Sequence, residues 1–160
     1  NPDEFKKTVD RLMSIYKELP AIGTDVITGF PGETDKEFNK SFKFIESLPF
    51  TYGHVFPFSV RAGTKAEIME KKDPVPKEVK KERAAVLRDL FEKKKNQYMQ
   101  SLDNTIDEVI IEERISEDLY NSTSSKFQTV EVAGNFKSTE LVKVKLKYID
   151  GTLKGNEFDK

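Results

Sequence analysis

Two short runs of β-branched and aromatic residues, 22–30 and 52–58, flank a segment with helical periodicity. When two strands of one sheet are joined through a helix, they run parallel, because the helix returns the chain to the edge where the first strand began. The spacing therefore predicts a βαβ unit. Its strands would end at residues 28–34 and 58–64, at the edge of the sheet where α/β folds bind ligands.

Helix start and stop signals surround this unit. An Asn-Pro pair at the N-terminus predicts a helix over 2–19, which Pro20 then ends. The residues expected on its apolar face are Phe5, Val9, Leu12, Met13, Tyr16 and Leu19. Thr34 and Glu37 have the spacing of a capping box, in which each residue caps the backbone of the other. They predict a second helix that reaches residue 48.

The middle of the chain is predicted to hold a loop and then a long third helix. Residues 61–76 contain a glycine, two prolines and mixed charges, which indicate an irregular loop. The third helix is predicted over 77–101, and the solvent side of an amphipathic helix is the expected place for its many basic residues, including Lys80 and Arg83. The residues expected to face inward are Val79, Val86, Leu87, Leu90, Phe91, Tyr98 and Leu102.

From Asn104 onward the pattern changes to short alternating stretches separated by turn-forming residues, which indicates a small all-β unit of roughly five strands. Residues 118–126 are rich in Ser, Asn and Asp, and we expect a long exposed loop there. The chain is thus predicted to be α/β over 1–102 and a small β-barrel over 103–160. The expected strands are 106–112, 127–132, 141–148 and 153–158.

Composition limits the chemistry that the chain can perform. It has no cysteine, which excludes disulfides, thiolate catalysis and a cysteine-held cluster within these residues. No apolar run approaches the roughly 20 residues that span a bilayer, so we expect no membrane segment. The balance of apolar and charged residues indicates a soluble protein, and the absence of cysteine favours a cytoplasmic one. The formal charge of −1 means that nucleic acid could be bound only through a local patch. The first residue is Asn1, without a visible signal peptide, and we interpret it as a boundary within a longer protein.

The residues alone offer few candidate site groups. The Gly-Phe-Pro-Gly-Glu-Thr run at 29–34 lacks the Lys-Ser/Thr ending of a phosphate-binding loop, and a capped turn is the simpler interpretation. His54, the only histidine, has no partner for a metal site and is expected to be a structural residue of the strand. Arg61 follows a strand end, where a guanidinium can bind a carboxylate or phosphate, although composition favours a surface ion pair with a glutamate.

A row of three lysines is the candidate nucleic-acid contact. Lys143, Lys145 and Lys147 alternate with apolar residues, which places them on one face of a strand. Such a row can follow a phosphate backbone. The alternative is a solvated strand, since residues 103–160 hold 8 basic and 12 acidic side chains.

Two motifs carry a resemblance to a known family. The run Ile-Gly-Thr-Asp-Val-Ile-Thr-Gly-Phe-Pro-Gly-Glu-Thr at 22–34 and the run His-Val-Phe-Pro-Phe-Ser-Val-Arg-Ala-Gly-Thr-Lys-Ala at 54–66 resemble the radical-SAM methylthiotransferases. Only Phe58 departs from the family pattern, where tyrosine is usual. The resemblance is strong over residues 3–92. The His-Val-Phe-Pro version is most similar to the branch that modifies threonylcarbamoyl-adenosine beside the tRNA anticodon.

The resemblance implies a fold, cofactors and a site. The chain would be the C-terminal part of a radical-SAM partial TIM barrel, followed by a TRAM (OB-like) RNA-binding barrel. It would be inactive alone, because the family's N-terminal domain and its three cysteines, which hold an iron-sulfur cluster that cleaves S-adenosylmethionine, would lie upstream. The partner would be tRNA, without catalytic or metal-binding residues in this chain. By resemblance, the cofactor-binding residues are Asp25, Ile27, Thr28, Phe56, Pro57, Ser59 and Arg61, and the RNA-binding residues are Lys143, Lys145 and Lys147.

Two other functions stay open at this point. The chain could be a free-standing RNA-binding module, or it could belong to the branch of the family that modifies a ribosomal protein. An incomplete barrel also predicts exposed apolar surface, and a possible dimer through the open edge of the sheet.

Overall fold

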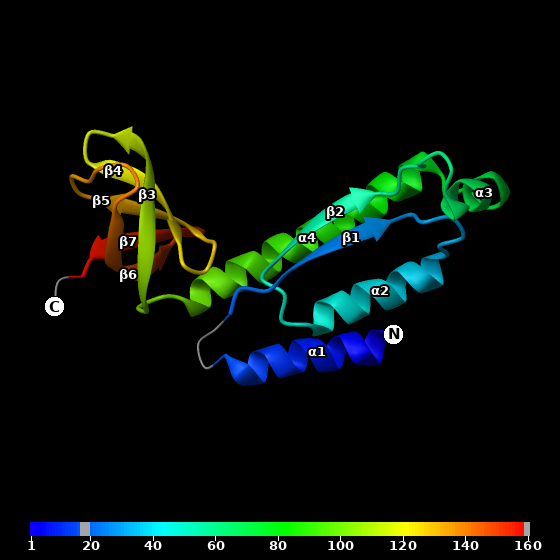
Figure 1. Cartoon of the computed structure of the whole chain (residues 1–160), viewed down its shortest axis with the longest axis horizontal. Helices are drawn as coiled ribbons and strands as arrows, with labels where there is room; N and C mark the ends of the chain where they lie inside the picture. Colours follow the sequence, from blue (N-terminus) through cyan, green and yellow to red (C-terminus); the bar gives the residue numbers. More distant parts are fainter. Residues whose placement is uncertain (17–19, 159–160) are drawn as a thin grey trace. The chain divides into compact units, whose positions relative to one another are not determined.

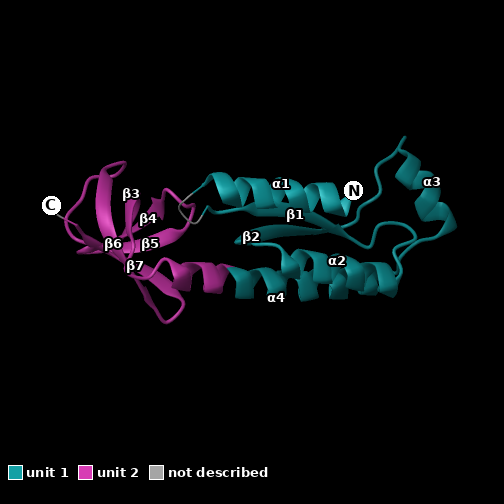
Figure 2. Ribbon diagram, turned by 90° about the horizontal axis from the view of Figure 1, so that it is seen from below, with its two compact units in different colours: residues 1–94 teal, residues 95–160 magenta. Residues whose placement is uncertain are grey.

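The computed structural model describes residues 1–16 and 20–158. The chain forms two compact units, residues 1–94 and 95–160 (Figure 2). The helices are α1 (Pro2–Ile15), α2 (Asp35–Ser47), α3 (Lys65–Lys72) and α4 (Lys77–Ser101). The strands are β1 (Gly23–Thr28), β2 (Tyr52–Pro57), β3 (Ile106–Ser116), β4 (Leu119–Ser124), β5 (Thr129–Ala133), β6 (Leu141–Ile149) and β7 (Thr152–Glu157).

The first unit contains the predicted parallel strand pair. β1 and β2 are hydrogen-bonded side by side, in a register that runs from Gly23 opposite Tyr52 to Thr28 opposite Pro57 (Figure 1). α2 lies between them in the sequence, so the chain crosses over through a helix. The prediction of a βαβ unit is confirmed.

The predicted capping residues begin α1 and α2. The Asn1 side chain accepts a hydrogen bond from the Asp3 N–H at 3.0 Å. At α2 the Glu37 N–H donates to the Thr34 hydroxyl oxygen, and the Thr34 N–H donates to the Glu37 carboxylate at 2.9 Å. The Thr34 hydroxyl also donates to the Glu37 carboxylate at 2.9 Å. The Thr34 N–H first, and then the Thr34 hydroxyl, lower the pKa of the exposed Glu37 carboxyl, because each donates a hydrogen bond to its charged form. The capping box is confirmed.

α1 is shorter and more exposed than predicted. It ends at Ile15, and Leu19 lies outside the described residues. Of the predicted apolar face, Val9 is buried, whereas Leu12 and Tyr16 are exposed. The helix pattern therefore identified the helix, but it overstated how much of that face is covered.

The core of the first unit lies where α1, α2 and α4 meet the sheet. Gly53 is what allows α4 to approach β2, because a Cβ at this position would lie 2.2 Å from the Phe91 ring. The buried residues of this core are Val9, Ile45, Leu48, Phe50, Val55, Ala84, Leu87, Leu90 and Phe91.

Three expectations for this unit are wrong. The segment predicted to be a loop contains α3, which Thr64 caps by accepting from the Glu67 N–H at 3.3 Å. This Thr-x-x-Glu spacing is the same start signal as that of α2. On α4, Val86 is exposed rather than inward, while Lys80 and Arg83 are buried rather than solvent-facing. The two cations are buried because distant segments supply their partners, described below.

The second unit is a closed five-stranded barrel with the order β3-β4-β5-β7-β6. Alternation along each strand puts one set of side chains inside, as the sequence pattern predicted. Most of the fully buried residues are aliphatic. They include Val109, Ile111, Val130, Val132, Val144, Leu146 and Leu153.

The predicted loop at 118–126 is wrong, because most of it is strand β4. The inward positions of β4 are Tyr120, Ser122 and Ser124. Ser122 is fully buried, and its hydroxyl donates to the Val130 carbonyl at 2.8 Å. A strand with hydroxyls pointing inward has a polar composition, so its sequence is typical of a loop. Within residues 1–16 and 20–158, no helix has the length and apolarity needed to cross a bilayer.

Candidate functional site

One face of the β1–β2 sheet packs on helices, and the other is open. Val55 and Thr28 belong to the packed face and are buried. Ile27 and Phe56, which are register partners, belong to the open face, where they are 59% and 51% exposed. Two large apolar side chains therefore lie side by side on the exposed face of the sheet, as expected for a ligand-binding or protein-binding surface.

Three rings follow one another along the open face of β2. The centroid of Tyr52 lies 6.0 Å from that of His54, which lies 6.4 Å from that of Phe56. Asp25 is the register partner of His54 on β1 and is also exposed. His54 is thus part of an exposed aromatic row, rather than the structural strand residue that we expected.

A pocket of about 440 Å³ opens where the two strands end. Five of the seven predicted cofactor-binding residues line it, namely Ile27, Phe56, Pro57, Ser59 and Arg61. The structure thus brings together residues from β1, β2 and the loop after β2, at the edge of the sheet that the βαβ topology indicated. Phe58, Thr64 and Ala66 complete the lining. Phe58 and Thr64 belong to the strand-end segment 58–64 that the sequence indicated, whereas Ala66 had not been assigned a binding role.

The other two predicted residues lie apart from this pocket. Asp25 shares the open face with Ile27 but does not line the pocket. Thr28 is 1% exposed, and its hydroxyl points to the Lys80 carbonyl on α4 at 3.4 Å. Successive side chains of a strand point to opposite faces, so Thr28 lies on the packed face and Ile27 on the open one.

The loop after β1 is held by its own glutamate. The Gly29 N–H donates to the Glu33 carboxylate at 2.8 Å. Gly29 has a φ of +69°, and a Cβ there would lie 2.3 Å from the Lys80 side chain, so this position requires glycine. The Gly-Phe-Pro-Gly-Glu-Thr run is therefore a structural turn, as the simpler interpretation predicted.

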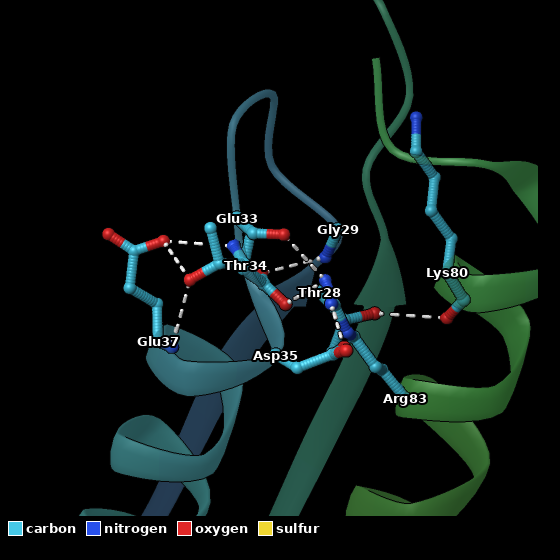
Figure 3. Close-up of polar contacts among 8 residues, drawn as sticks. All are labelled: Thr28, Gly29, Glu33, Thr34, Asp35, Glu37, Lys80 and Arg83. Carbon is cyan, nitrogen blue, oxygen red and sulfur yellow. Dashed lines mark hydrogen bonds and ion pairs between the residues drawn. The ribbon is translucent and has the colours of Figure 1, made fainter. Parts of the chain in front are cut away.

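Arg83 of α4 fastens this loop to the helix (Figure 3). Its guanidinium donates to the Glu33 carboxylate at 2.8 Å, to the Glu33 carbonyl at 3.0 Å and to the Asp35 carboxylate at 2.7 Å. Beside it, Lys80 pairs with Glu70 at 2.7 Å. These buried pairs link α3, α4 and the loop after β1, and the sequence reasoning missed them, although the Glu33 of the first motif was a visible signal.

The loop after β2 is fixed in a similar way. The Thr64 hydroxyl donates to the Arg61 carbonyl at 2.8 Å, and the Gly63 N–H donates to the Glu67 carboxylate at 2.9 Å. The Arg61 backbone is thus positioned at the pocket, while its guanidinium is exposed. Apolar walls with one guanidinium and the hydroxyls of Ser59 and Thr64 can bind a small molecule that has both an apolar part and an anionic group.

The three predicted RNA-binding lysines lie together on the outer face of β6. Lys143, Lys145 and Lys147 are all exposed and alternate with buried residues. Lys147 contacts the Asp103 carboxylate at 3.3 Å, and Asp103 also accepts from the Tyr148 N–H at 2.9 Å. The hydrogen bond from the Tyr148 N–H, and to a smaller extent the contact with Lys147, lower the pKa of the Asp103 carboxyl. Among the described residues, Lys143 and Lys145 have no ion-pair partner.

The chain combines a pocket at the ends of two parallel strands with a closed β-barrel. No protein-family model matches it. It is 43% identical over 110 residues, 68% of its length, to a threonylcarbamoyladenosine tRNA methylthiotransferase of Bacillus subtilis, of which the match covers 24%. The corresponding enzyme of Aquifex aeolicus is 35% identical over 96 residues, 60% of this chain and 23% of that enzyme.

A second kind of tRNA-modifying enzyme is also similar. The tRNA-2-methylthio-N(6)-dimethylallyladenosine synthase of Opitutus terrae is 34% identical over 110 residues, which are 69% of this chain and 22% of that enzyme. The chain is therefore a homologue of the tRNA methylthiotransferases, and the predicted resemblance is confirmed. It spans about a quarter of the length of these relatives.

Proposed function

We propose that this chain is the C-terminal part of a radical-SAM, iron-sulfur-dependent tRNA methylthiotransferase, which adds a methylthio group to a modified adenosine next to the anticodon. The observation that carries the proposal is the 43% identity over 110 residues to a threonylcarbamoyladenosine tRNA methylthiotransferase. The His-Val-Phe-Pro motif favours the same branch. Such an enzyme acts on cytoplasmic tRNA, and the proposed location is the cytoplasm.

The proposed domains follow the two kinds of structure. Residues 1–102 would be the last strands and helices of a radical-SAM partial barrel, and the parallel β1–β2 pair with its open face supports this. Residues 103–160 would be a TRAM-like barrel, and the closed five-stranded sheet supports this. The break between compact units falls a few residues earlier, after Lys94, inside α4.

The pocket has the chemistry needed to hold S-adenosylmethionine. Ile27, Phe56 and Pro57 offer apolar surface for a nucleoside, and Arg61 offers a guanidinium for a carboxylate. When bound, this cofactor supplies the methyl group and the radical chemistry of the enzyme class. The role of the residues in this chain is to bind and orient it, with the Glu33–Arg83 pair keeping the adjoining loop in place.

The iron-sulfur cluster does not fit this chain by itself. The sequence has no cysteine, and the residues at 1–16 and 20–158 hold no group of three potential metal ligands. The ligands of the cluster would come from the rest of the protein, so we expect the 160-residue chain to be inactive alone.

A chimera tests the proposed activity. Residues 1–102 would replace the matched segment of the Bacillus subtilis enzyme, and tRNA nucleosides would be analysed by mass spectrometry after reaction. We expect the methylthiolated nucleoside from the chimera, its loss with Arg61→Ala, and its retention with Lys93→Ala, an exposed cation on α4 that lies outside the pocket. Retained activity in the Arg61→Ala chimera would contradict the assignment of the pocket.

A salt series tests the proposed substrate. The 160-residue chain would be titrated with full tRNA and, separately, with a peptide from a ribosomal protein. Preference for tRNA that weakens as salt rises would support the tRNA branch, because phosphate contacts release counterions. Preference for the peptide would favour the branch that modifies a ribosomal protein. Tight tRNA binding by a chain whose chimera is inactive would favour a free-standing RNA-binding module.

A further inference from the structure

The turn between β4 and β5 displays an aromatic ring. Phe127 is 76% exposed, the highest value among the exposed large apolar residues of the described chain. It makes no ring–ring or cation–π contact within that part of the chain. The ring therefore adds little to the stability of the barrel.

The backbone at Phe127 is also unfavourable for this residue type. Its φ is +55°, in the left-handed region that suits glycine, asparagine and aspartate. Of the other three non-glycine residues with positive φ, Asn104 and Asp150 are of the tolerant types, and the third is Thr139. Hairpins with three-residue loops normally place glycine at this last loop position. Folding alone thus favours glycine over phenylalanine at position 127.

The turn that carries the ring is tightly hydrogen-bonded. The Ser124 hydroxyl oxygen accepts from the N–H groups of Lys126 and Gln128, both at 3.2 Å. The Phe127 N–H donates to the Ser124 carbonyl at 2.9 Å, and the Ser125 N–H donates to the backbone carbonyl of Glu108 on β3 at 2.9 Å. Because these bonds hold the backbone of the turn, the chain loses little backbone freedom when the ring binds a ligand.

Cationic side chains lie close to this turn. Glu108, which bonds Ser125, is also the register partner of Lys143 on β6. Ser125 and Lys143 are therefore about two strand spacings apart, roughly 10 Å. Lys145 lies two residues further along the same outer face. An exposed ring near the exposed ammonium groups of Lys143 and Lys145 is a combination that binds single-stranded nucleic acid, through base stacking and phosphate contacts.

We propose that Phe127 is a nucleobase-stacking residue of the barrel, which binds an unpaired base of an RNA whose backbone contacts Lys143 and Lys145. This inference rests on the proposed RNA-binding function and adds to it a stacking residue and a preference for unpaired bases. Glu108 lies between the ring and the lysines, so stacking rather than charge would determine how strongly this part of the surface binds.

A tryptophan reporter tests the stacking directly. The chain has no tryptophan, so Phe127→Trp introduces a single indole at this site. Titration with a single-stranded RNA 12-mer should quench its fluorescence, because a stacked base quenches an indole. Ile115→Trp is the matched control, since Ile115 is exposed on the same barrel but lies near the β3–β4 turn, at the opposite end of β4 from Phe127. We expect its fluorescence to change little.

Affinity measurements separate stacking from folding. Phe127→Gly should weaken binding of the RNA 12-mer by roughly 5- to 150-fold, without lowering the melting temperature. The control Thr139→Gly relieves a similar left-handed backbone, and it should leave affinity unchanged.

Each outcome of these experiments decides the inference. Unchanged RNA affinity in Phe127→Gly, with an unquenched indole in Phe127→Trp, would overturn it and leave RNA binding in place. If the unmodified chain binds neither tRNA nor the RNA 12-mer, the proposed RNA function of the barrel fails together with it. Loss of affinity for a protein partner instead of RNA would assign the ring to protein docking and overturn the inference too.

Discussion

Replacing Arg83 by methionine should loosen the loop next to the pocket. The Arg83 side chain is 7% exposed and bonds Glu33, whose side chain is 16% exposed, as well as Asp35, whose side chain is 90% exposed. The variant would leave the Glu33 carboxylate buried without its cation. Because that carboxylate also holds the Gly29 N–H, the loop over residues 29–34 should open.

The magnitude follows from the burial of each partner. Breaking a buried pair by removing one member costs about 3–5 kcal/mol. The bond to the exposed Asp35 carboxylate contributes at most about 1 kcal/mol, because water screens it. We therefore expect Arg83→Met to lower the free energy of unfolding of the first unit by about 3–5 kcal/mol, and the control Asp35→Asn to lower it by less than about 1 kcal/mol.

Hydrogen exchange followed by mass spectrometry measures this effect locally. Peptides that cover 29–34 and α4 should lose protection in Arg83→Met, while barrel peptides from 106–157 serve as the internal reference and should not change. Urea unfolding followed by helical circular dichroism gives the overall loss of stability. A cost below about 1 kcal/mol, with unchanged exchange at 29–34, would refute the conclusion that this ion pair holds the loop.

Three further predictions test other parts of the molecule. Burial, and then the negative charge of Asp107, raise the pKa of Tyr98 to about 12. The folded state therefore prefers the neutral phenol. The stability that this preference contributes is complete below the ordinary tyrosine pKa of about 10 and is lost between pH 10 and 12. Absorbance titration at 295 nm should show a step near pH 12 that Tyr98→Phe removes. Gly53→Ala should place a methyl carbon 2.2 Å from the Phe91 ring and lower the free energy of unfolding by about 1–3 kcal/mol. Thermal unfolding would measure this loss, and an unchanged melting temperature would refute the close approach of α4 to β2. Finally, Lys143, Lys145 and Lys147 would be changed together to glutamine. This change should reduce the slope of log tRNA affinity against log salt concentration by about 2–3, and an unchanged slope would exclude these lysines from the interface.

Local sequence determined the elements whose signals lie within a few residues. Asn1, Thr34 and Glu37 cap backbone groups of their own helices, so their spacing alone located the helix starts. The parallel strand pair followed from chain geometry, because two paired strands that are joined through a helix run in the same direction. The same topology indicated the edge where Ile27 and Arg61 now line a pocket.

Tertiary structure decided which polar groups are buried and which faces are open. Arg83 and Lys80 are inside because Glu33 and Glu70, 50 and 10 residues away in sequence, neutralise them there. Ser122 can lie inside the barrel because its hydroxyl donates a hydrogen bond to the Val130 carbonyl. Burial of a polar group depends on a partner that folding brings from elsewhere, so a local pattern predicts solvent exposure or a loop for such residues. That is why the sequence located α1, α2, α4 and most strands, while only the folded chain placed Thr28 away from the pocket and joined the loop at 29–34 to α4.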